Sequence, residues 1–390
     1  MTRPLRIVII GAGMGGLTAA SAARQRGFEV AVYERSAELG EVGAGLQIGP
    51  SAVKVLRALG IAERLRPLAC EPGEILSVDG RSGALRFRES LAGIAAARFG
   101  APYLTAHRAD LHRLLAGTLP ASALRLGAVC TGAASSRTGA VAHFADGSAV
   151  EADLVVGADG IRSAVRESLF GADAPRFTGQ MAWRGIVPID CVPTAFGPGG
   201  SVRAAATDFV GWIGPEGHVI CYPIRGGALY NIFAGHVAPA WVEESWTVPS
   251  SRTELLDGYA GWNAALLAML GRIEHCYKWG IYDRDPLTAW TRGRVTLLGD
   301  AAHPMMPTLA QGAAIAIEDG YALARTLAAM PGEVTAALAA YAAERIPRAS
   351  RVQLQARAQF ENNKKQPAPP PLDRSWIFEH DVTRDPARTV

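Results

Sequence analysis

The chain has 390 residues, of which 49% are hydrophobic and 19% are charged. This apolar content excludes wholesale disorder, and the length predicts two or three domains at about 150 residues each. The formal net charge is only +3 and is spread along the chain without a basic stripe, which argues against nucleic acid as a partner.

The five cysteines are odd in number and widely spaced, at positions 70, 130, 191, 221 and 276. They form neither a CxxC pair nor a metal-ligand spacing with histidine. We therefore expect free thiols, a reducing cytoplasmic location and no metal site. No run of 18 consecutive apolar residues occurs, so we also expect no transmembrane helix.

The first 35 residues alternate between strand and helix patterns. Residues 6–10 form an apolar strand pattern, residues 15–26 have helical spacing, and residues 30–34 form a second strand pattern. The short connections between them indicate a βαβ unit. The fold class that we expect is therefore α/β, with a Rossmann-type nucleotide-binding domain.

The turn after the first strand reads GAGMGG, which matches GxGxxG and contributes Gly11, Gly13, Gly15 and Gly16. In this pattern the first glycine permits a tight turn, the second lets a pyrophosphate approach the backbone, and the third allows close helix packing. The helix N-terminus then faces the phosphate charge. The turn predicts dinucleotide binding, and the alternative is a glycine turn kept only for packing.

An acidic residue follows where a dinucleotide site needs one. Glu34 lies 18 residues beyond Gly16, at the carboxyl end of the second strand. There its carboxylate can accept hydrogen bonds from an adenosine ribose, and it should repel a 2'-phosphate, which favours NAD or FAD over NADP. The next residue, Arg35, is a further cofactor-binding candidate.

The rest of the chain changes character twice. Helix patterns begin at Pro50 and Arg108, and short alternating runs predict strands over residues 124–156. Residues 178–282 contain alternating, aromatic-rich segments, which predict a mostly antiparallel sheet. The strand RVTLLGD and the helix pattern of residues 311–330 then return to the first type. The predicted organisation is a nucleotide-binding domain of residues 1–177 and 283–330, an inserted substrate-binding sheet domain of residues 178–282, and a C-terminal helix and tail of residues 331–390.

Three segments indicate which dinucleotide is bound. GAGMGG with YER, GADGIRSAVR, and the long LLGDAAHPMMPTLAQGAAIAIEDG resemble the FAD motifs of the flavin-dependent aromatic hydroxylases, the para-hydroxybenzoate hydroxylase family. Within that family, GAGLQIGP, HRADLH, YPIRGGALYN, KWGIYDRDPL and WIFEHDV are most similar to salicylate hydroxylase, 3-hydroxybenzoate 6-hydroxylase and 6-hydroxynicotinate 3-monooxygenase. The resemblance spans nearly the whole chain.

The resemblance implies a monooxygenase with tightly, non-covalently bound FAD, working as a monomer or homodimer in aromatic compound catabolism. NADH or NADPH would visit transiently to reduce the flavin, and O2 would form a flavin C4a-hydroperoxide that hydroxylates a small phenolic or heteroaromatic acid. Alternatives are a tailoring hydroxylase or epoxidase acting on a larger polyketide or urate-like substrate, a scaffold that binds the nucleotide without turnover, and an NAD-dependent dehydrogenase.

The family's cofactor contacts carry over to several positions. The aspartate matching Asp300 accepts hydrogen bonds from the ribityl hydroxyls of FAD, although the same residue type also serves as a helix cap or in a buried ion pair. The resemblance implies an FAD contact at Arg108 and a role at Asp159 in binding the FAD pyrophosphate or NAD(P)H.

Pro304 and Pro307 delay the next helix until about residue 311. By resemblance, that helix N-terminus points at the flavin pyrimidine ring. Further candidates for cofactor binding are Gly45, Cys130, Gly312 and Ala313.

Two arginines after the GADG turn carry a separate hypothesis. Arg162 and Arg166 have i, i+4 spacing, so they would share one face of a helix and could meet an anionic nicotinamide cofactor. The alternative is an exposed basic pair.

On the substrate side, His218 and Tyr222 in HVICYPI would share one strand face. They match a histidine and a tyrosine that border the substrate in the hydroxybenzoate and hydroxynicotinate enzymes, so we expect catalytic roles for both. Gln47 departs from the hydroxynicotinate enzyme, which has a histidine there, and this favours a phenolic acid because glutamine is no base. Pro307 is a further substrate-binding candidate. The remaining candidates for the pocket wall are Trp183, Arg184, Arg203, Trp212 and Tyr230, with Arg184 or Arg203 as the candidate partner for a substrate carboxylate.

Overall fold

The computed structural model describes residues 3–40, 44–238, 240, 248–363, 365 and 372–384. Gly43, in the predicted turn of GAGLQIGP, lies outside the described residues, as does most of the proline-rich stretch after residue 365. No helix in the described part of the chain is both long enough and apolar enough to cross a membrane.

The predicted βαβ unit is present. Strand β1 (Arg6–Ile10), helix α1 (Met14–Gln25) and strand β2 (Glu29–Glu34) follow one another, and the two strands pair in parallel. They belong to a six-stranded sheet with the order β21-β22-β12-β1-β2-β8. Its other strands are β8 (Leu124–Leu126), β12 (Leu154–Gly157), β21 (Thr291–Arg292) and β22 (Val295–Leu297). Because β22 pairs in parallel with β12, the chain returns to this sheet after the inserted segment, as the sequence predicts.

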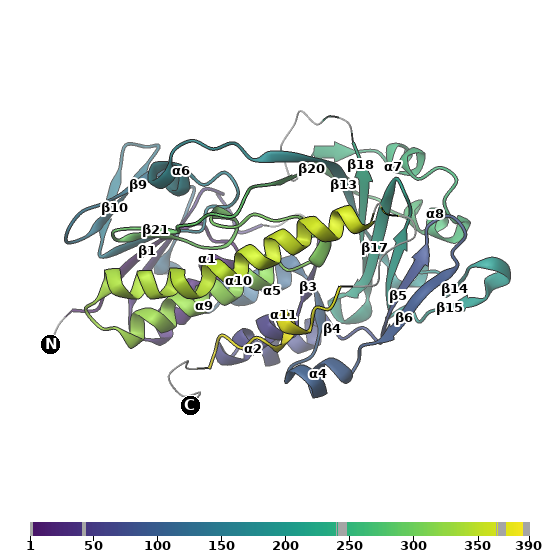
Figure 1. The fold of residues 1–390 in the computed structure, drawn as a ribbon, viewed down its shortest axis with the longest axis horizontal. Coiled ribbons are helices and arrows are strands. Elements are labelled where there is room, and N and C mark those ends of the chain that lie inside the picture. Colours follow the sequence, from purple (N-terminus) through teal and green to yellow (C-terminus); the bar gives the residue numbers. More distant parts are fainter. Residues whose placement is uncertain are drawn as a thin grey trace.

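Helix α9 (Gly312–Ala329) packs directly on α1. A Cβ on Gly320 would lie 2.7 Å from the carbonyl oxygen of Gly15 and 2.6 Å from the backbone nitrogen of Ala19, so only glycine permits this approach. The contact brings the start of α9 next to the glycine turn. The long helix α10 (Val334–Asn363) covers α9 and runs across the molecule toward the larger sheet (Figure 1).

The predicted second sheet is present and larger than expected. It has eight strands in the order β19-β20-β13-β18-β17-β16-β5-β6, and its pairings are antiparallel except for β16 with β5. The strands are β5 (Glu74–Asp79), β6 (Leu85–Ser90), β13 (Arg176–Pro188), β16 (Phe209–Ile213), β17 (Gly217–Ile224), β18 (Leu229–Val237), β19 (Val248–Ser250) and β20 (Cys276–Asp283). Strands β5 and β6 come from residues that the sequence analysis assigned to the nucleotide-binding domain. In Figure 1 this sheet lies at the right and the six-stranded sheet at the left.

A small antiparallel sheet joins the two large ones. It consists of β3 (Gly45–Ile48), β7 (Leu104–His107) and β4 (Ala69–Cys70), and the Thr105 hydroxyl on β7 donates to the carbonyl oxygen of Pro223 on β17 at 2.5 Å. Helix α11 (Ser375–Glu379) packs beside it, against α2 (Pro50–Ala58) and α4 (Ile94–Phe99). The remaining helices are α3 (Ala62–Leu65), α5 (Arg108–Ala116), α6 (Ala164–Phe170), α7 (Arg252–Gly258) and α8 (Ala264–Leu270), and the remaining strands are β9 (Cys130–Ser135), β10 (Ala140–Phe144), β11 (Ala149–Ala152), β14 (Ala195–Phe196) and β15 (Val202–Arg203).

Candidate active site

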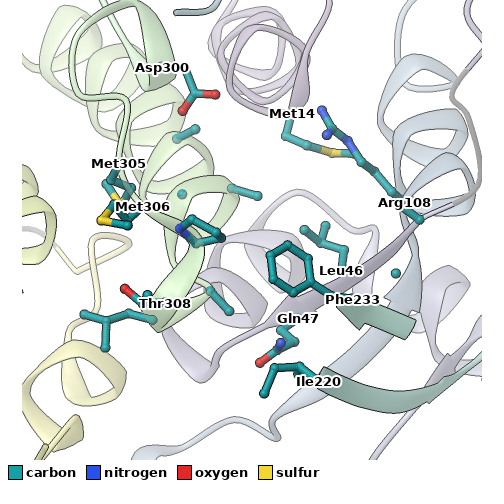
Figure 2. A pocket seen from close by; sticks show the side chains of 18 of the residues that line it. Met14, Leu46, Gln47, Arg108, Ile220, Phe233, Asp300, Met305, Met306 and Thr308 are labelled. Carbon is teal, nitrogen blue, oxygen red and sulfur yellow. The ribbon is translucent and has the colours of Figure 1, made fainter. Parts of the chain in front are cut away.

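A cavity of about 1580 Å³ lies between the two large sheets. Its walls come from the glycine turn, the start of α9, the small sheet and one face of the eight-stranded sheet. Drug-sized ligand pockets measure about 300–1000 Å³, so this cavity has room for a dinucleotide together with a smaller molecule. Figure 2 shows Asp300 and Arg108 toward one end of it and Gln47, Ile220 and Thr308 toward the other.

The glycines of the turn after β1 fall into two groups, according to whether packing requires them. Gly11 has a φ of +104°, and a Cβ there would lie 2.3 Å from the carbonyl oxygen of Ala158. A Cβ on Gly16 would lie 2.0 Å from the carbonyl oxygen of Gly11, and one on Gly15 would meet a leucine side chain at 2.7 Å. At Gly13, by contrast, a Cβ would meet nothing within 4 Å, and the residue faces the cavity. Packing therefore explains three of the glycines, whereas packing does not require glycine at position 13, where the backbone is open to the cavity.

Glu34 and Arg35 line the cavity at the end of β2. The Glu34 carboxylate accepts hydrogen bonds from the backbone nitrogens of Ala12, at 2.8 Å, and Ser36, at 3.0 Å. The residue therefore holds the glycine turn in place. Its predicted contact with an adenosine ribose stays a prediction.

Cys130 and Asp159 also line this end of the cavity. Burial raises the pKa of the Cys130 thiol to about 11, so the group is a neutral part of the wall. The Asp159 carboxylate accepts from the Ser163 hydroxyl at 2.5 Å and from the backbone nitrogen of Val165 at 3.2 Å, at the start of α6. Asp159 thus supports α6 from a position on the cavity wall.

The pairing of Arg162 with Arg166 on one exposed helical face is wrong. Helix α6 begins at Ala164, so Arg162 precedes it and lies exposed at the cavity rim. The Arg166 side chain is only 5% exposed and forms an ion pair with Asp173 at 2.8 Å. Of the two arginines, Arg162 alone is placed to meet a visiting anion.

Asp300 lies three residues after the end of β22, in a short 3-10 turn (Gly299–Ala301). Its side chain is exposed to the cavity, and the cavity itself is enclosed by protein. The resulting desolvation raises the pKa of the Asp300 carboxyl, and the positive charge of Arg108 opposes this rise. Within the described residues it caps neither this turn nor α9. The carboxylate is thus directed at the cavity, where ribityl hydroxyls would be suitable partners.

The segment after Asp300 is a loop, in which prolines delay the next helix as predicted. Pro307 begins a 3-10 turn (Pro307–Leu309), and α9 starts at Gly312, close to the predicted position. Gly312, Ala313 and Pro307 all line the cavity. The N-terminus of an 18-residue helix carries partial positive charge, so this end of the cavity favours an electron-rich group.

A buried ionic cluster supports that loop, and no prediction from the sequence included it. The Asp319 carboxylate accepts from the backbone nitrogen of Gly299 at 3.1 Å, from His303 Nε2 at 2.5 Å and from Arg345 Nε at 2.7 Å. Arg345 also pairs with Glu318 at 2.8 Å, and all these side chains are buried. Asp319 thereby fixes the residues on both sides of Asp300. The only available signal was the last part of the third motif, EDG.

One face of the eight-stranded sheet forms the wall at the other end. On β17, His218, Ile220 and Tyr222 line the cavity, whereas Val219 and Cys221 belong to the core on the opposite face. His218 and Tyr222 therefore share a strand face, as alternation predicts. Their roles in catalysis stay predictions.

The same alternation corrects the wider set of wall candidates. Arg184 lines the cavity and lies 3.9 Å from the ring centre of Trp279. Trp183 and Trp212 point to the opposite face of the sheet and are buried in its core, as is Tyr230. The last candidate, Arg203, is exposed on β15 and lies outside the cavity wall. Arg203 is therefore excluded as a partner for a substrate carboxylate within this cavity.

Tyr222 is held from two sides. Its ring stacks on Phe209, with centroids 5.7 Å apart and an angle of 6° between the planes. On strand β3, a Cβ on Gly45 would lie 2.6 Å from Tyr222 Cε2, so glycine is needed for the ring to fit. Gln47 lines the cavity beside it, and Gln47 Oε1 accepts from the Tyr103 hydroxyl at 2.5 Å.

His218 is buried, and its ring stacks on Phe233 with centroids 5.6 Å apart. Burial lowers the pKa of the His218 imidazole to about 4. The ring is therefore neutral at pH 7 and has one donor and one acceptor nitrogen.

The C-terminal segment also reaches the cavity, which the sequence analysis did not anticipate. Arg374 and Phe378 line it, and the Phe378 ring packs edge-on against Tyr103 at 5.8 Å. Lys54 Nζ donates to the carbonyl oxygens of Phe378, Glu379 and His380 at 3.0–3.2 Å and so anchors the end of α11. WIFEHDV carried a resemblance but no local pattern that predicts where it docks.

Among the described residues, no group of three or more His, Cys, Asp or Glu side chains is arranged to hold a metal ion. All five cysteines are free thiols.

Comparison with known proteins agrees with this geometry. A family model described as an FAD binding domain matches residues 5–356. The 3-amino-4-hydroxybenzoate 2-monooxygenase PtnB3 of Streptomyces platensis is 40% identical over 352 residues, which are 90% of this chain and 87% of that protein. The 6-hydroxynicotinate 3-monooxygenase of Pseudomonas fluorescens is 37% identical over 396 residues, covering 99% of this chain and 97% of that one. A solved salicylate hydroxylase substrate complex superposes with a TM-score of 0.81 at 29% identity, over 97% of this chain and 96% of the other.

Proposed function

Since the chain belongs to the family defined by this FAD binding domain and is a flavin-dependent monooxygenase, we propose that it hydroxylates a small phenolic or heteroaromatic acid with NAD(P)H and O2. The observation that carries the proposal is the continuity of the cavity. One end has the open glycine backbone and Asp300, and the other has a buried aromatic wall with the Tyr222 hydroxyl.

The residues present fit FAD. Gly13 leaves the backbone of the turn accessible to a pyrophosphate at the start of α1, and the Asp300 carboxylate faces the cavity as a partner for the ribityl hydroxyls. The start of α9 at Gly312 supplies a partial positive charge beside the place for the ring. When bound, FAD supplies electron transfer from the nicotinamide and activation of oxygen.

The chain's own residues bind, orient and shield the substrate. The Tyr222 hydroxyl and the neutral His218 ring offer hydrogen bonds to a ring oxygen or nitrogen, and Phe209, Ile220 and Phe233 supply an apolar wall that excludes water. Arg184, on the same sheet face, is the candidate partner for the substrate carboxylate.

The two relatives that the chain matches over most of its length act, by their names, on 3-amino-4-hydroxybenzoate and 6-hydroxynicotinate. Both compounds carry a carboxylate and a ring hydroxyl para to each other. We propose a substrate of this class, which the charge of Arg184 and the hydroxyl of Tyr222 in one cavity support.

We propose further that NAD(P)H visits the flavin transiently, because a second dinucleotide turn is missing from the sequence and Arg162 lies exposed at the cavity rim. A cytoplasmic location is supported by the five free thiols. A monomer or homodimer is the proposed assembly.

The test is consumption of NADH and NADPH by the purified yellow protein, with oxygen and peroxide readouts. The panel contains 3-amino-4-hydroxybenzoate, 6-hydroxynicotinate, salicylate, 3-hydroxybenzoate, urate, and benzoate as the analogue without a ring oxygen. We expect one hydroxy acid to speed nicotinamide oxidation and to yield a hydroxylated product with little peroxide, while benzoate does not. Stimulation by urate alone, or by none of the acids, would contradict the substrate class and favour the tailoring hydroxylase or epoxidase.

A further inference from the structure

We propose that Arg374, in the C-terminal segment, is a specificity-determining residue. It supplies a second positive charge for the carboxylate of the substrate, in addition to that of Arg184. The inference rests on the proposed function, because the carboxylate belongs to a substrate in the same cavity. It goes beyond that function by giving the C-terminal segment a part in substrate recognition.

The segment that carries Arg374 is fixed to the rest of the molecule. Lys54 on α2 donates to three of its carbonyl oxygens, and Arg348 on α10 donates to a fourth at 2.9 Å. Arg98 on α4 donates to the Ser375 hydroxyl at 2.7 Å. Three separate helices therefore hold the start of α11, and with it Arg374, at the cavity wall.

The Arg374 guanidinium lies over the ring of Phe378, with its carbon 5.6 Å from the ring centre. The same ring packs edge-on against Tyr103. Burial raises the pKa of the Tyr103 hydroxyl to about 12, and the positive charge of Arg374 opposes this rise. Tyr103 donates to Gln47, which Figure 2 places at the end of the cavity away from Asp300. Arg374 is therefore close to the substrate end of the cavity.

No carboxylate in the described part of the chain forms an ion pair with Arg374. Asp373 and Glu89 also line the cavity, but neither is paired with it. The Asp373 carboxylate instead accepts from the backbone nitrogen of Ser375 at 2.9 Å. A guanidinium has five N–H donors, so Arg374 can offer a charged, planar group to a ligand.

Other arginines of the wall are engaged within the protein. Arg86 forms an ion pair with Asp79 at 2.8 Å, and Arg98 binds the hydroxyl of the C-terminal segment. Arg108 lies toward the end with Asp300 in Figure 2. Arg374 is thus better placed than these three to meet an anionic substituent of the substrate.

The chemical consequence is selectivity for a carboxylate. Arg184 reaches the cavity from β13 and Arg374 from the residue before α11, so positive charge comes from two unconnected elements. Arginine pairs with a carboxylate through charge-assisted, often bidentate hydrogen bonds, and an apolar wall reduces their screening by water. A carboxamide of the same shape carries no charge and gains much less from either arginine.

The experiment compares each acid with its own amide. Dissociation constants of the FAD-loaded enzyme are measured for 3-amino-4-hydroxybenzoate and 3-amino-4-hydroxybenzamide, and for 6-hydroxynicotinate and 6-hydroxynicotinamide. Binding is followed by the change in flavin absorbance, without turnover. We expect Arg374→Met to weaken binding of the acids about tenfold and to leave binding of the amides and of FAD unchanged.

The matched control is Arg351→Met. The Arg351 guanidinium lies 3.8 Å from the ring centre of Trp376 on the same helix, α11, but Arg351 is exposed and outside the cavity wall. This variant removes a cation and its aromatic contact from the same region. All four dissociation constants should match those of the wild type.

A second variant, Arg374→Lys, makes the test independent of any loss of packing in Arg374→Met. Lysine keeps the charge but lacks the planar fork, so the acids should bind with an affinity between those of the wild type and Arg374→Met. Equal weakening of acids and amides, or wild-type discrimination in Arg374→Met, would overturn the role of Arg374.

Arg184→Met separates this inference from the proposed function. If that variant loses the acids selectively while Arg374→Met does not, the proposed function stands and the inference about Arg374 is wrong. If the wild type binds neither 3-amino-4-hydroxybenzoate nor 6-hydroxynicotinate, the proposed function itself fails, and this inference fails with it.

Discussion

At the scale of single residues, neighbouring glycines of one motif serve different purposes. Gly16 lies against the carbonyl oxygen of Gly11, so it is required by the folded chain whether or not a cofactor is bound. Gly13 has a φ of −71° and a ψ of −178°, which any residue adopts, and nothing protein-derived lies near its missing Cβ. A substitution can therefore separate packing from binding at this turn.

We predict that Gly13→Ala folds normally but binds FAD more than tenfold more weakly. The methyl group would stand where the pyrophosphate approaches, while the stability of the FAD-free protein should change by less than about 0.5 kcal/mol. Flavin titration and urea unfolding of the FAD-free protein measure the two effects. The comparison is Gly16→Ala, in which a Cβ 2.0 Å from an oxygen should cost about 1–3 kcal/mol of stability. Wild-type FAD affinity in Gly13→Ala would contradict the assigned phosphate site.

At the scale of elements, the position of Asp300 depends on side chains of α9 and α10 that do not themselves line the cavity. Asp319 on α9 fixes Gly299 and His303, and Arg345 on α10 pairs with Asp319 and Glu318. These charges are buried, so their attraction offsets a large desolvation cost only while the cluster is complete. The ionic cluster thus joins α10 to the loop that presents Asp300.

Removing Arg345 takes one partner from each of two buried carboxylates, although Glu318 keeps its ion pair with Arg348 and Asp319 keeps its contact with His303. We predict that Arg345→Met lowers the free energy of unfolding by about 3–5 kcal/mol. The matched control is Arg384→Met, because Arg384 is 77% exposed and its ion pair with Asp381 should contribute no more than about 1 kcal/mol. Urea unfolding of both variants at pH 7.5 decides the point, and equal stability of the two would refute the role of the cluster.

At the scale of the whole molecule, local patterns in the sequence predicted the helices and strands better than they predicted which of these elements pack together. The βαβ unit, the alternation on β17 and the start of α9 are all encoded within short windows, and the structure agrees with them. Strand β5 was missed as part of the large sheet because its parallel partner, β16, lies more than 120 residues away. The bond from Tyr103 to Gln47 and the docking of Phe378 also join residues that are far apart in the sequence. The predictions of cavity-wall residues were wrong at positions where only alternation within the assembled sheet decides which face a residue occupies.

The stability of the whole molecule should also depend on pH through His218, which is buried, and His380, which is partly buried. Burial lowers the pKa of both His218 and His380 to about 4, from a usual value of 6.5. Below pH 6.5 the unfolded chain binds these protons while the folded protein does not, so protonation favours unfolding. The stabilising contribution is therefore complete above pH 6.5 and is lost as the pH falls to about 4.

We predict that the free energy of unfolding is flat from pH 8 to 7 and then decreases by at most about 1.4 kcal/mol per pH unit for each histidine. Below about pH 4.5 the decline should continue, because the pKa values of Glu318 and Asp319 are lowered in the folded state. Urea unfolding with saturating FAD at pH 7.5, 6.5, 5.5 and 4.5 measures this. His380→Asn should make the slope between pH 6.5 and 4.5 shallower, whereas the same change at the exposed His143 should not. A slope that is identical in wild type and His380→Asn would show that the coupling of this histidine to folding is absent.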